Sequence, residues 1–469
     1  RRRWKNECPI RIKRPFLLHK TLSIEIGKNP VKRIIGAAAG IEYFQRERNM
    51  SVESTLSDGN GLFATKLSPS EFALKVIEIV RSEGDQGLRR IITALDGSPP
   101  KSFEVPQSKI DSAFESLDPK SVSALKLAVE QVRAFQSRAL PKSWSDSKQN
   151  LGERVTPLNS VAAYVPAGTA PLASTVIMTV VPAQVAGVEE IIVVTPATGN
   201  STPHPAVLTA AKIAGATRVF TIGGAQAIAA MAYGTETVPA VDLICGPGNV
   251  WVTAAKKLVY GDVGIDGLYG PTETMVIADD SAKPSFTASD LIAQAEHDPL
   301  AMPILVALSE EIVINTETEI NRQLKYLPRG EIARSAFTNR GVAVIVNNTA
   351  EAIDVANSAA PEHLCILTTD ADKLIDKVKN AGGLFVGEWS AEIMADYIAG
   401  PSHVMPTGGT ARFSSALSVR DFIRVTPVLT FNEATFLELS QHAELLAKLE
   451  GLQGHAAASE YRRQYIIGE

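Results

Sequence analysis

The sequence has few cysteines and no long apolar run. Three cysteines occur among 469 residues, Cys8, Cys245 and Cys365, and no two of them form a CxxC pair. This excludes a disulfide framework and a thiolate zinc site as organising features, and it indicates a reducing, cytoplasmic compartment. The longest apolar patch near the start, residues 34–41, is far shorter than the roughly 20 residues that a membrane-spanning helix requires.

No strong excess of one charge extends over the whole chain. The sequence carries 46 Lys/Arg and 51 Asp/Glu, and its acidic bulk argues against nucleic-acid binding as the main function. Residues 1–50 are the exception, because they hold a large excess of Lys and Arg. Three interpretations stay open for them: a targeting segment, a basic nucleic-acid tail, or sequence ahead of a true start at Met50. The first and third are favoured.

The length and the apolar pattern predict an α/β protein with more than one domain. A chain of 469 residues exceeds what one core usually holds. Short β-rich runs alternate with helical segments over residues 161–273 and again over residues 274–386. This alternation is typical of parallel sheets with helical crossovers. We therefore expect two Rossmann-like α/β domains with parallel sheets and a small helical C-terminal arm.

Several elements outside the alternating regions can also be placed. Ser68 and Glu71 have the spacing of a capping box and predict a helix over residues 68–90. The polar stretch 149–156 is interpreted as a connector. The chain after Gly408 is expected to be irregular at first and then helical from residue 433.

Two glycine-rich turns follow predicted strands, GGAQ at residues 223–226 and GPGN at residues 246–249. Backbone N–H groups at such turns can hold a phosphate, with help from the following helix N-terminus. Neither turn has the GxGxxG pattern, so dinucleotide binding and simple tight turns are equally good interpretations. Cys245 has apolar neighbours and is interpreted as a buried structural thiol rather than a nucleophile.

Gln294 and His297 lie three residues apart on a predicted helix, so their side chains share one face and could bind one metal ion. Zinc needs about four donors, and such a pair supplies only two. Asp396 and His455 are candidates for the others, although spacing alone does not show that the four converge. A solvated helix surface is the simpler interpretation of the pair.

Glu362 and His363 are adjacent in the segment APEHL, near the start of a predicted strand. A histidine can remove a hydroxyl proton near neutral pH, and a neighbouring carboxylate can activate water or hold the imidazole. Taken alone, the two residues are more simply interpreted as a solvated dipeptide.

Together these stretches resemble the histidinol dehydrogenase family over residues 68–455. The motifs occur in the order of the family and with similar gaps. They are AAYVPAGTAPLAST, GGAQAIAAMAYGTETVP, GPGNVWVTAAKK, GIDGLYGPTE, AQAEHDP, APEHL, DYIAGPSHVMPTGGTARFSS and EGLQGH.

The resemblance implies a zinc-dependent, NAD-linked oxidation of a small polar alcohol, with Glu362 and His363 as the catalytic pair. Other roles are implied in three sets. The implied zinc ligands are Gln294, His297, Asp396 and His455; the implied NAD contacts are Tyr164, Gln226 and Asn249; and the implied substrate contacts are Thr272, His403 and Glu450 together with the zinc ligands and His363.

The resemblance also implies a homodimer in which the C-terminal arm completes the partner's site. With it, the domains are expected as follows. Residues 1–60 form the basic segment, residues 61–163 and 274–410 the domain with the zinc and catalytic residues, residues 164–273 the NAD-binding domain, and residues 411–469 the arm.

Three positions depart from the common family pattern: Ala167, Thr272 and Ser402. All three lie near the implied substrate or cofactor contacts, so a paralogue that oxidises another small alcohol, such as a diol or a hydroxy sulfonate, is a second interpretation. A zinc hydrolase and a non-catalytic zinc-binding dimer are the remaining alternatives. The retained Glu362, His363 and glycine-rich turns argue against both.

Overall fold

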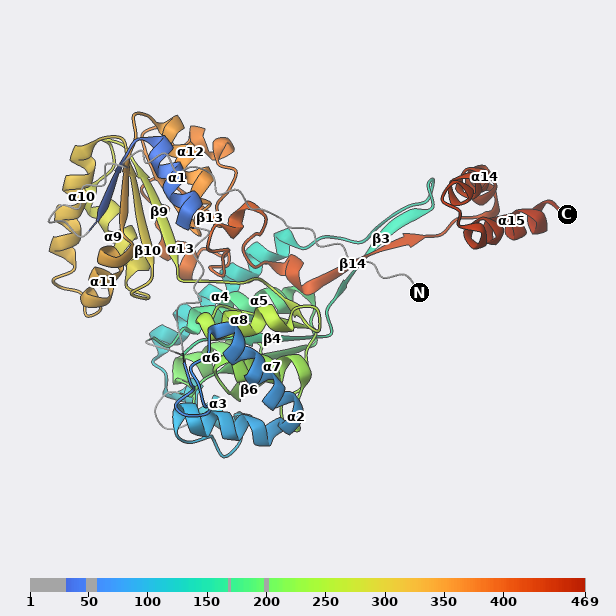
Figure 1. Cartoon of the computed structure of the whole chain (residues 1–469), viewed down its shortest axis with the longest axis horizontal. Helices are drawn as coiled ribbons and strands as arrows, with labels where there is room; N and C mark the ends of the chain where they lie inside the picture. The colour runs from blue at the N-terminus through green and yellow to red at the C-terminus, as the bar shows by residue number, and fades with distance from the viewer. Residues whose placement is uncertain (1–30, 48–56, 168–169, 198–201, 469) are drawn as a thin grey trace, which may run out of the picture.

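The computed structural model describes residues 31–47, 57–167, 170–197 and 202–468. Two parallel sheets, each covered by helices on both faces, form two units, and a slender arm extends away from them (Figure 1). The expected α/β fold with parallel sheets is confirmed. Among the helices in these ranges, none combines the length and apolar character that crossing a bilayer requires.

The six-stranded sheet is parallel throughout and forms the core of one unit. One face packs against α9 (Pro284–Ala295), α10 (Glu310–Gln323) and α11 (Gly330–Arg340). The other packs against α1 (Ala37–Glu47) and α12 (Thr349–Ala359), and the short helices η1 (Ala371–Lys377) and α13 (Glu392–Tyr397) follow later in the chain. In spatial order the strands are β1 (Lys32–Ile35), β11 (Val342–Ile345), β10 (Met302–Ala307), β9 (Glu273–Ala278), β12 (His363–Leu367) and β13 (Gly383–Val386).

The five-stranded sheet is also parallel and forms the core of the second unit. One face packs against α2 (Pro69–Asp96), α7 (Gly224–Tyr233) and α8 (Val250–Val259). The other packs against α3 (Gln107–Ser116), α4 (Pro119–Ala139), α5 (Ala173–Ala186) and α6 (Pro205–Ala214). In spatial order the strands are β6 (Arg218–Thr221), β5 (Glu190–Thr195), β4 (Ser160–Tyr164), β7 (Leu243–Cys245) and β8 (Gly264–Ile265).

A small antiparallel sheet carries the arm. Its strands are β14 (Ile423–Leu429), β3 (Leu151–Pro157) and β2 (Trp144–Asp146). The segment interpreted as a polar connector is therefore a strand, because β3 pairs with β14 over seven residues. The short helices η2 (Thr410–Arg412) and η3 (Val419–Phe422) precede β14, and α14 (Glu433–Leu449) and α15 (Gln453–Ile467) form the end of the arm (Figure 1).

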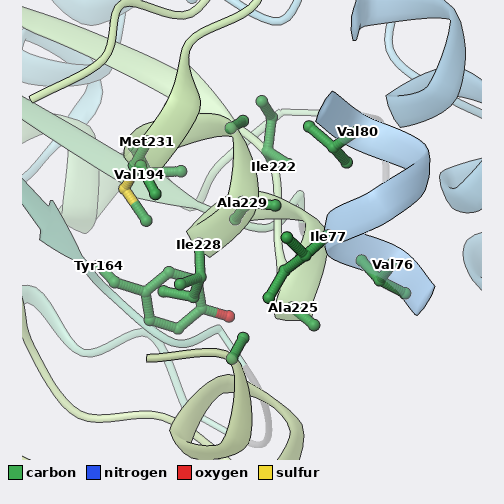
Figure 2. Packing of buried hydrophobic residues seen from close by; sticks show 14 of the residues in the cluster. Val76, Ile77, Val80, Tyr164, Val194, Ile222, Ala225, Ile228, Ala229 and Met231 are labelled. Atoms are coloured by element: carbon green, nitrogen blue, oxygen red, sulfur yellow. The ribbon is translucent and has the colours of Figure 1, made fainter. Parts of the chain in front are cut away.

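The packing of the first helices differs from the expected division of the chain. The sequence analysis assigns residues 61–163 to the same domain as residues 274–410, but α2, α3 and α4 pack on the five-stranded sheet. Figure 2 shows the reason for α2, because its apolar side chains Val76, Ile77 and Val80 face α7. The five-stranded unit is thus inserted between α1 and β9 of the six-stranded unit.

The N-terminal residues also differ from the expectation of one separate basic segment. Residues 32–35 form the edge strand β1 beside β11, and Ile34 and Phe44 are each only 4% exposed. Arg33 contributes its charge within the fold, where it pairs with Glu310 at 2.9 Å and Glu317 at 2.7 Å. Residues 1–30 and 48–56, with the proposed start at Met50, lie outside the described residues.

The opening of α2 follows the expected capping box. The Ser68 hydroxyl accepts from the Glu71 N–H at 3.4 Å, and the Glu71 carboxylate accepts from the Ser68 N–H at 2.9 Å. The helix continues to Asp96 across a kink at Gly84, which has φ of 55°. The prediction of a helix that begins here is confirmed, while its end lies six residues later than predicted.

Candidate active site

Glu362 and His363 lie at the amino-terminal edge of the six-stranded sheet. Helix α12 ends at Ala360, whose φ of 51° is left-handed and uncommon for a residue with a Cβ. Glu362 follows two residues later, and His363 begins β12. Because β9 and β12 are parallel neighbours, the residues at the start of both strands meet at one edge. Thr272 and Glu273 are thereby brought beside the pair.

Strand β13 holds the backbone of Glu362 from the other side. The Gly383 N–H donates to the Glu362 carbonyl at 2.8 Å. A Cβ on Gly382 would lie 2.6 Å from the same carbonyl oxygen, so this approach is possible only for glycine. The position of the Glu362 backbone is therefore fixed by both neighbouring strands.

The carboxylate of Glu362 is buried and oriented by two hydrogen bonds. The Thr272 hydroxyl donates to Oε2 at 2.6 Å, and the Glu273 N–H donates to the same atom at 3.0 Å. Burial raises the pKa of Glu362, although the nearby His363 and both donors act in the opposite direction. A carboxyl group in this environment can accept a proton more readily than one in water.

His363 is 2% exposed and is surrounded by carboxylates. Its Nδ1 lies 3.2 Å from the Glu273 carbonyl oxygen, and its ring stacks on Phe385. Its Nε2 lies 3.4 Å from Asp396 Oδ1 without a well-aligned hydrogen bond. Burial lowers the pKa of His363, but the carboxylates Glu362, Glu392 and Asp396 outweigh it and raise the pKa to about 10. These carboxylates therefore favour the protonated ring near neutral pH, with Nε2 facing Asp396.

Glu273 is a third carboxyl group at this edge, and the sequence analysis did not single it out. Its Oε1 accepts from the Gly408 N–H at 3.0 Å. Burial, followed by the like charge of Glu362, raises the pKa of Glu273 to about 7. Its position in the motif GPTE, one residue after Thr272, could have marked Glu273 as a candidate. That it lies beside Glu362 depends on the register between β9 and β12, which the sequence does not show.

The three candidate zinc ligands of the six-stranded unit lie beside this pair. The Gln294 amide donates from Nε2 to Asp396 Oδ2 at 2.9 Å, and its Oε1 lies 3.1 Å from the Thr272 hydroxyl oxygen. Asp396 is also the main opposite charge near His297. Burial lowers the pKa of His297, which keeps the imidazole in the neutral form that binds metals.

His403 connects this cluster to the five-stranded unit. Its Nδ1 lies 2.9 Å from the Asp396 carbonyl oxygen, and its Nε2 lies 3.2 Å from the Thr175 hydroxyl of α5. Burial lowers the pKa of His403 as well. The histidine that was expected to contact the substrate therefore lies between the two units.

The fourth candidate ligand is not part of this cluster. His455 and Glu450 lie on the exposed surface of the arm, far from the two sheets (Figure 1). Within the described ranges of one chain, no three His, Cys, Asp or Glu side chains form a group that could hold a metal ion. Gln294, His297 and Asp396 offer an amide, an imidazole and a carboxylate, which are suitable zinc donors but an incomplete set.

The three candidate NAD contacts lie at the carboxyl edge of the five-stranded sheet. Tyr164 ends β4, Gln226 lies in the turn and helix after β6, and Asn249 begins the helix after β7. The order of the strands reverses between β4 and β7, and ligands of open α/β sheets bind at such a point.

Two of these three side chains make hydrogen bonds within the fold, and the third has a polar atom that could bind a ligand. The Tyr164 hydroxyl accepts from the Gly224 N–H at 3.0 Å, and burial raises the pKa of Tyr164 to about 12, so the phenol stays neutral. Asn249 Oδ1 caps α8 by accepting from Trp251 and Val252, each at 3.1 Å. Gln226 Oε1 is buried and has no partner among the described residues, which fits an atom that waits for a ligand.

Comparisons with known proteins identify relatives of this chain. A model of the histidinol dehydrogenase family matches residues 67–463. Histidinol dehydrogenase from Thermus thermophilus is 50% identical over 395 residues, which cover 84% of this chain and 94% of that protein. The one from Deinococcus radiodurans is 47% identical over 414 residues, which cover 87% of this chain and 94% of that protein.

A solved structure extends the similarity to three dimensions. The crystal structure of histidinol dehydrogenase from Elizabethkingia anophelis aligns with a TM-score of 0.86 at 29% identity. The alignment covers 94% of this chain and 100% of that one. Family match, identity and fold agree over nearly the whole length, so the chain belongs to the histidinol dehydrogenase family and is an oxidoreductase.

Proposed function

We propose that this protein oxidises L-histidinol to L-histidine with NAD, at a zinc site that the arm of a partner subunit completes. The observation that carries the proposal is the buried pair Glu362 and His363 beside Gln294 and Asp396. The names of the relatives support the choice of histidinol. The incomplete ligand set within one chain supports a dimer, since His455 lies on the arm.

The site residues have distinct roles in this proposal. Zinc, held by Gln294, His297, Asp396 and His455 of the partner subunit, would fix the substrate nitrogens and so place the alcohol carbon beside the nicotinamide. Thr272 and His403 contact the substrate from the same subunit. Glu450 of the partner subunit contacts it as well. Tyr164, Gln226 and Asn249 hold the dinucleotide at the carboxyl edge of the five-stranded sheet.

The catalytic pair acts in both oxidation steps. His363 takes the hydroxyl proton through Nε2 while a hydride leaves the alcohol carbon for NAD. The aldehyde stays bound while water adds to its carbonyl carbon. Glu362 accepts a proton from the water, and His363 returns its own proton to the carbonyl oxygen, which gives the hydrate. His363 then takes a proton from the hydrate as a second hydride leaves. The raised pKa of Glu362 suits it to accept a proton. The positive charge of zinc on Asp396 would offset the carboxylates that favour the protonated His363 ring, and so would leave the ring able to act as a base.

The experiment that tests this function is an NADH absorbance assay with the zinc-loaded protein. L-histidinol and NAD should give about two NADH per alcohol consumed. Treatment with a chelator should remove the activity, and added zinc should restore it. Absence of an NADH signal with any alcohol in a panel would contradict the proposal and return the zinc hydrolase and the non-catalytic dimer as candidates.

A second candidate is oxidation of another small polar alcohol by the same residues. Thr272 favours this alternative, because its hydroxyl lies between Glu362 and Gln294. Compared with the serine that is usual in the family at this position, its methyl group adds volume there. One methyl group in a close pocket changes discrimination by about 1–3 kcal/mol. An NADH signal with a diol or a hydroxy sulfonate, but not with histidinol, would select this candidate.

A further inference from the structure

A buried ion pair lies in the five-stranded unit, outside the residues discussed so far. Lys256 of α8 and Asp266, which follows β8, form a salt bridge in which the two side chains are 2% and 0% exposed. Such pairs are rare in protein interiors, because removing two charges from water costs about as much as their attraction returns. Fold stability alone therefore gives a weak reason for this pair.

The pair holds one residue of the GPGN turn by both of its backbone polar groups. The Lys256 ammonium donates to the Gly246 carbonyl at 3.0 Å, and the Gly246 N–H donates to Asp266 Oδ2 at 2.6 Å. Gly246 has φ of 106°, and a Cβ there would lie 2.1 Å from the Tyr164 carbonyl oxygen. The ion pair thus fixes, directly against the end of β4, a turn that only glycine can form at this position.

The pair is stabilised by the attraction between its own charges, by this turn and by the Tyr269 ring. Burial raises the pKa of Asp266, while Lys256 and the Gly246 N–H lower it. The ammonium also lies 4.9 Å from the centre of the Tyr269 ring, which adds a cation–π contact. Both side chains are therefore held in place, and their hydrogen bonds restrain the backbone of Gly246.

We propose that Lys256 and Asp266 are positioning residues for the dinucleotide site. They hold the Gly246 turn in the one conformation that places Asn249 and the N-terminus of α8 against the cofactor. The inference rests on the proposed NAD function and adds two residues to it that do not themselves touch the cofactor. Only two residues separate Gly246 from Asn249, so a change in the turn moves Asn249 and Tyr164 relative to each other.

The double variant Lys256→Met, Asp266→Asn tests this role in the zinc-loaded protein. It removes both charges, so neither is left buried without a partner, and Asn keeps an acceptor for the Gly246 N–H. The bond to the Gly246 carbonyl is lost. We expect the Kd for NADH, measured by its fluorescence, and the KM for NAD to rise at least about tenfold. The kcat at saturating NAD and the KM for the alcohol should stay within about threefold.

The exposed pair Lys212 and Asp111 of the same unit supplies the matched control. Its side chains are 37% and 43% exposed, and they join α6 to α3. The variant Lys212→Met, Asp111→Asn should leave every parameter unchanged. If the first double variant does not fold, Lys256→Leu with Asp266→Asn replaces it, because leucine also removes the donor to the Gly246 carbonyl and no charge is left buried without a partner.

Two outcomes would overturn the inference alone. One is a Kd for NADH in the variant equal to that of the unaltered protein. The other is an equal change in the parameters for NAD and for the alcohol, which would mean that the pair only holds the fold. Failure of the unaltered protein to bind NADH would instead overturn the proposed function, and this inference with it.

Discussion

At the scale of single residues, the catalytic edge contains more negative than positive charge. Glu362, Glu392 and Asp396 all act on His363, and Glu273 lies next to Glu362. In the described ranges these carboxyl groups are buried or nearly buried, so their mutual repulsion is poorly screened. The pKa values of Glu273 and Glu362 are therefore raised, as is that of His363, and these carboxyl groups bind protons more readily than exposed ones do.

Replacing His363 by Asn should lower kcat by roughly 100- to 10,000-fold, because a general base contributes about this much. Zinc content should stay unchanged, since the ligands are other side chains. The assay is NADH formation together with metal analysis. The control is His204→Asn, because His204 caps α6 through Nδ1 and Asn is an equally good capping residue. Loss of zinc from the His363 variant would contradict the assigned role.

Glu273→Gln should change how stability depends on pH. The folded protein holds a proton on Glu273 up to about pH 7, whereas the unfolded chain releases it near 4.5. The carboxyl group of the unaltered protein therefore makes folding less favourable as pH rises from about 4.5 to 7. Gln cannot lose a proton, so the variant should gain about 1–3 kcal/mol relative to the unaltered protein between pH 5 and pH 8.

Thermal unfolding at both pH values measures this difference. Glu351→Gln is the control, because hydrogen bonds from Asn347 lower the pKa of Glu351 from its ordinary value of 4.5. Its carboxyl group is ionised in both the folded and the unfolded chain above pH 5, so the stability difference between this variant and the unaltered protein should not change between pH 5 and pH 8. A constant difference between the Glu273 variant and the unaltered protein would mean that Glu273 titrates normally.

Candidate site residues could be named from the sequence, but the environment in which the structure places them could not be predicted from it. Glu362 and His363 stand out only in the company of the other motifs, because a Glu-His dipeptide has no signal of its own. The contacts from Thr272 and Glu273 depend on the register between β9 and β12. That register is set by packing of the whole sheet, which no local pattern shows.

At the scale of elements, the long alternating runs were predicted well and the short polar ones were not. The buried strands of both sheets are apolar runs in the sequence, and the structure has them in the two regions, 161–273 and 274–386, where alternating strands and helices are predicted. Strand β3 has no apolar run because only one of its seven residues is buried, and its partner β14 lies far away in the sequence. Strand β1 has only four residues and lies inside a basic stretch, so the sequence pattern did not indicate a strand there.

Two neighbouring variants test whether β1 belongs to the sheet. Ile34 is 4% exposed and Ile35 is 64% exposed. Ile34→Ala should reduce the free energy of unfolding by about 2–5 kcal/mol, because it leaves a cavity in the core. Ile35→Ala should have an effect within about 0.5 kcal/mol. Thermal or denaturant unfolding measures both, and equal effects would show that β1 is not packed as described.

At the scale of the whole molecule, the arm carries its own unpaired apolar surface. Leu445, Leu446 and Leu449 are between 62% and 84% exposed in the single chain. The arm also carries His455 and Glu450 away from the rest of the site. Both observations fit the proposal that a second copy receives the arm.

A hybrid of two inactive chains tests this exchange. His363→Asn and His455→Asn should each abolish activity as pure dimers. In a hybrid dimer, purified through two different tags, one site has both residues intact and the other has neither. The hybrid should therefore have roughly half of the activity of the unaltered dimer. No activity in the hybrid would show that each chain uses its own His455.

The insertion of one unit into the other has a consequence for the order of folding. Strand β1 pairs with residues 342–345, so the edge of the six-stranded sheet cannot close until most of the chain is present. The inserted unit makes nearly all of its contacts within itself and has no such delay. We expect it to fold first and to bring the two flanking segments together, because pairing of distant strands is slow when the connecting chain is unfolded. The strand that comes first in the sequence is then among the last to find its place.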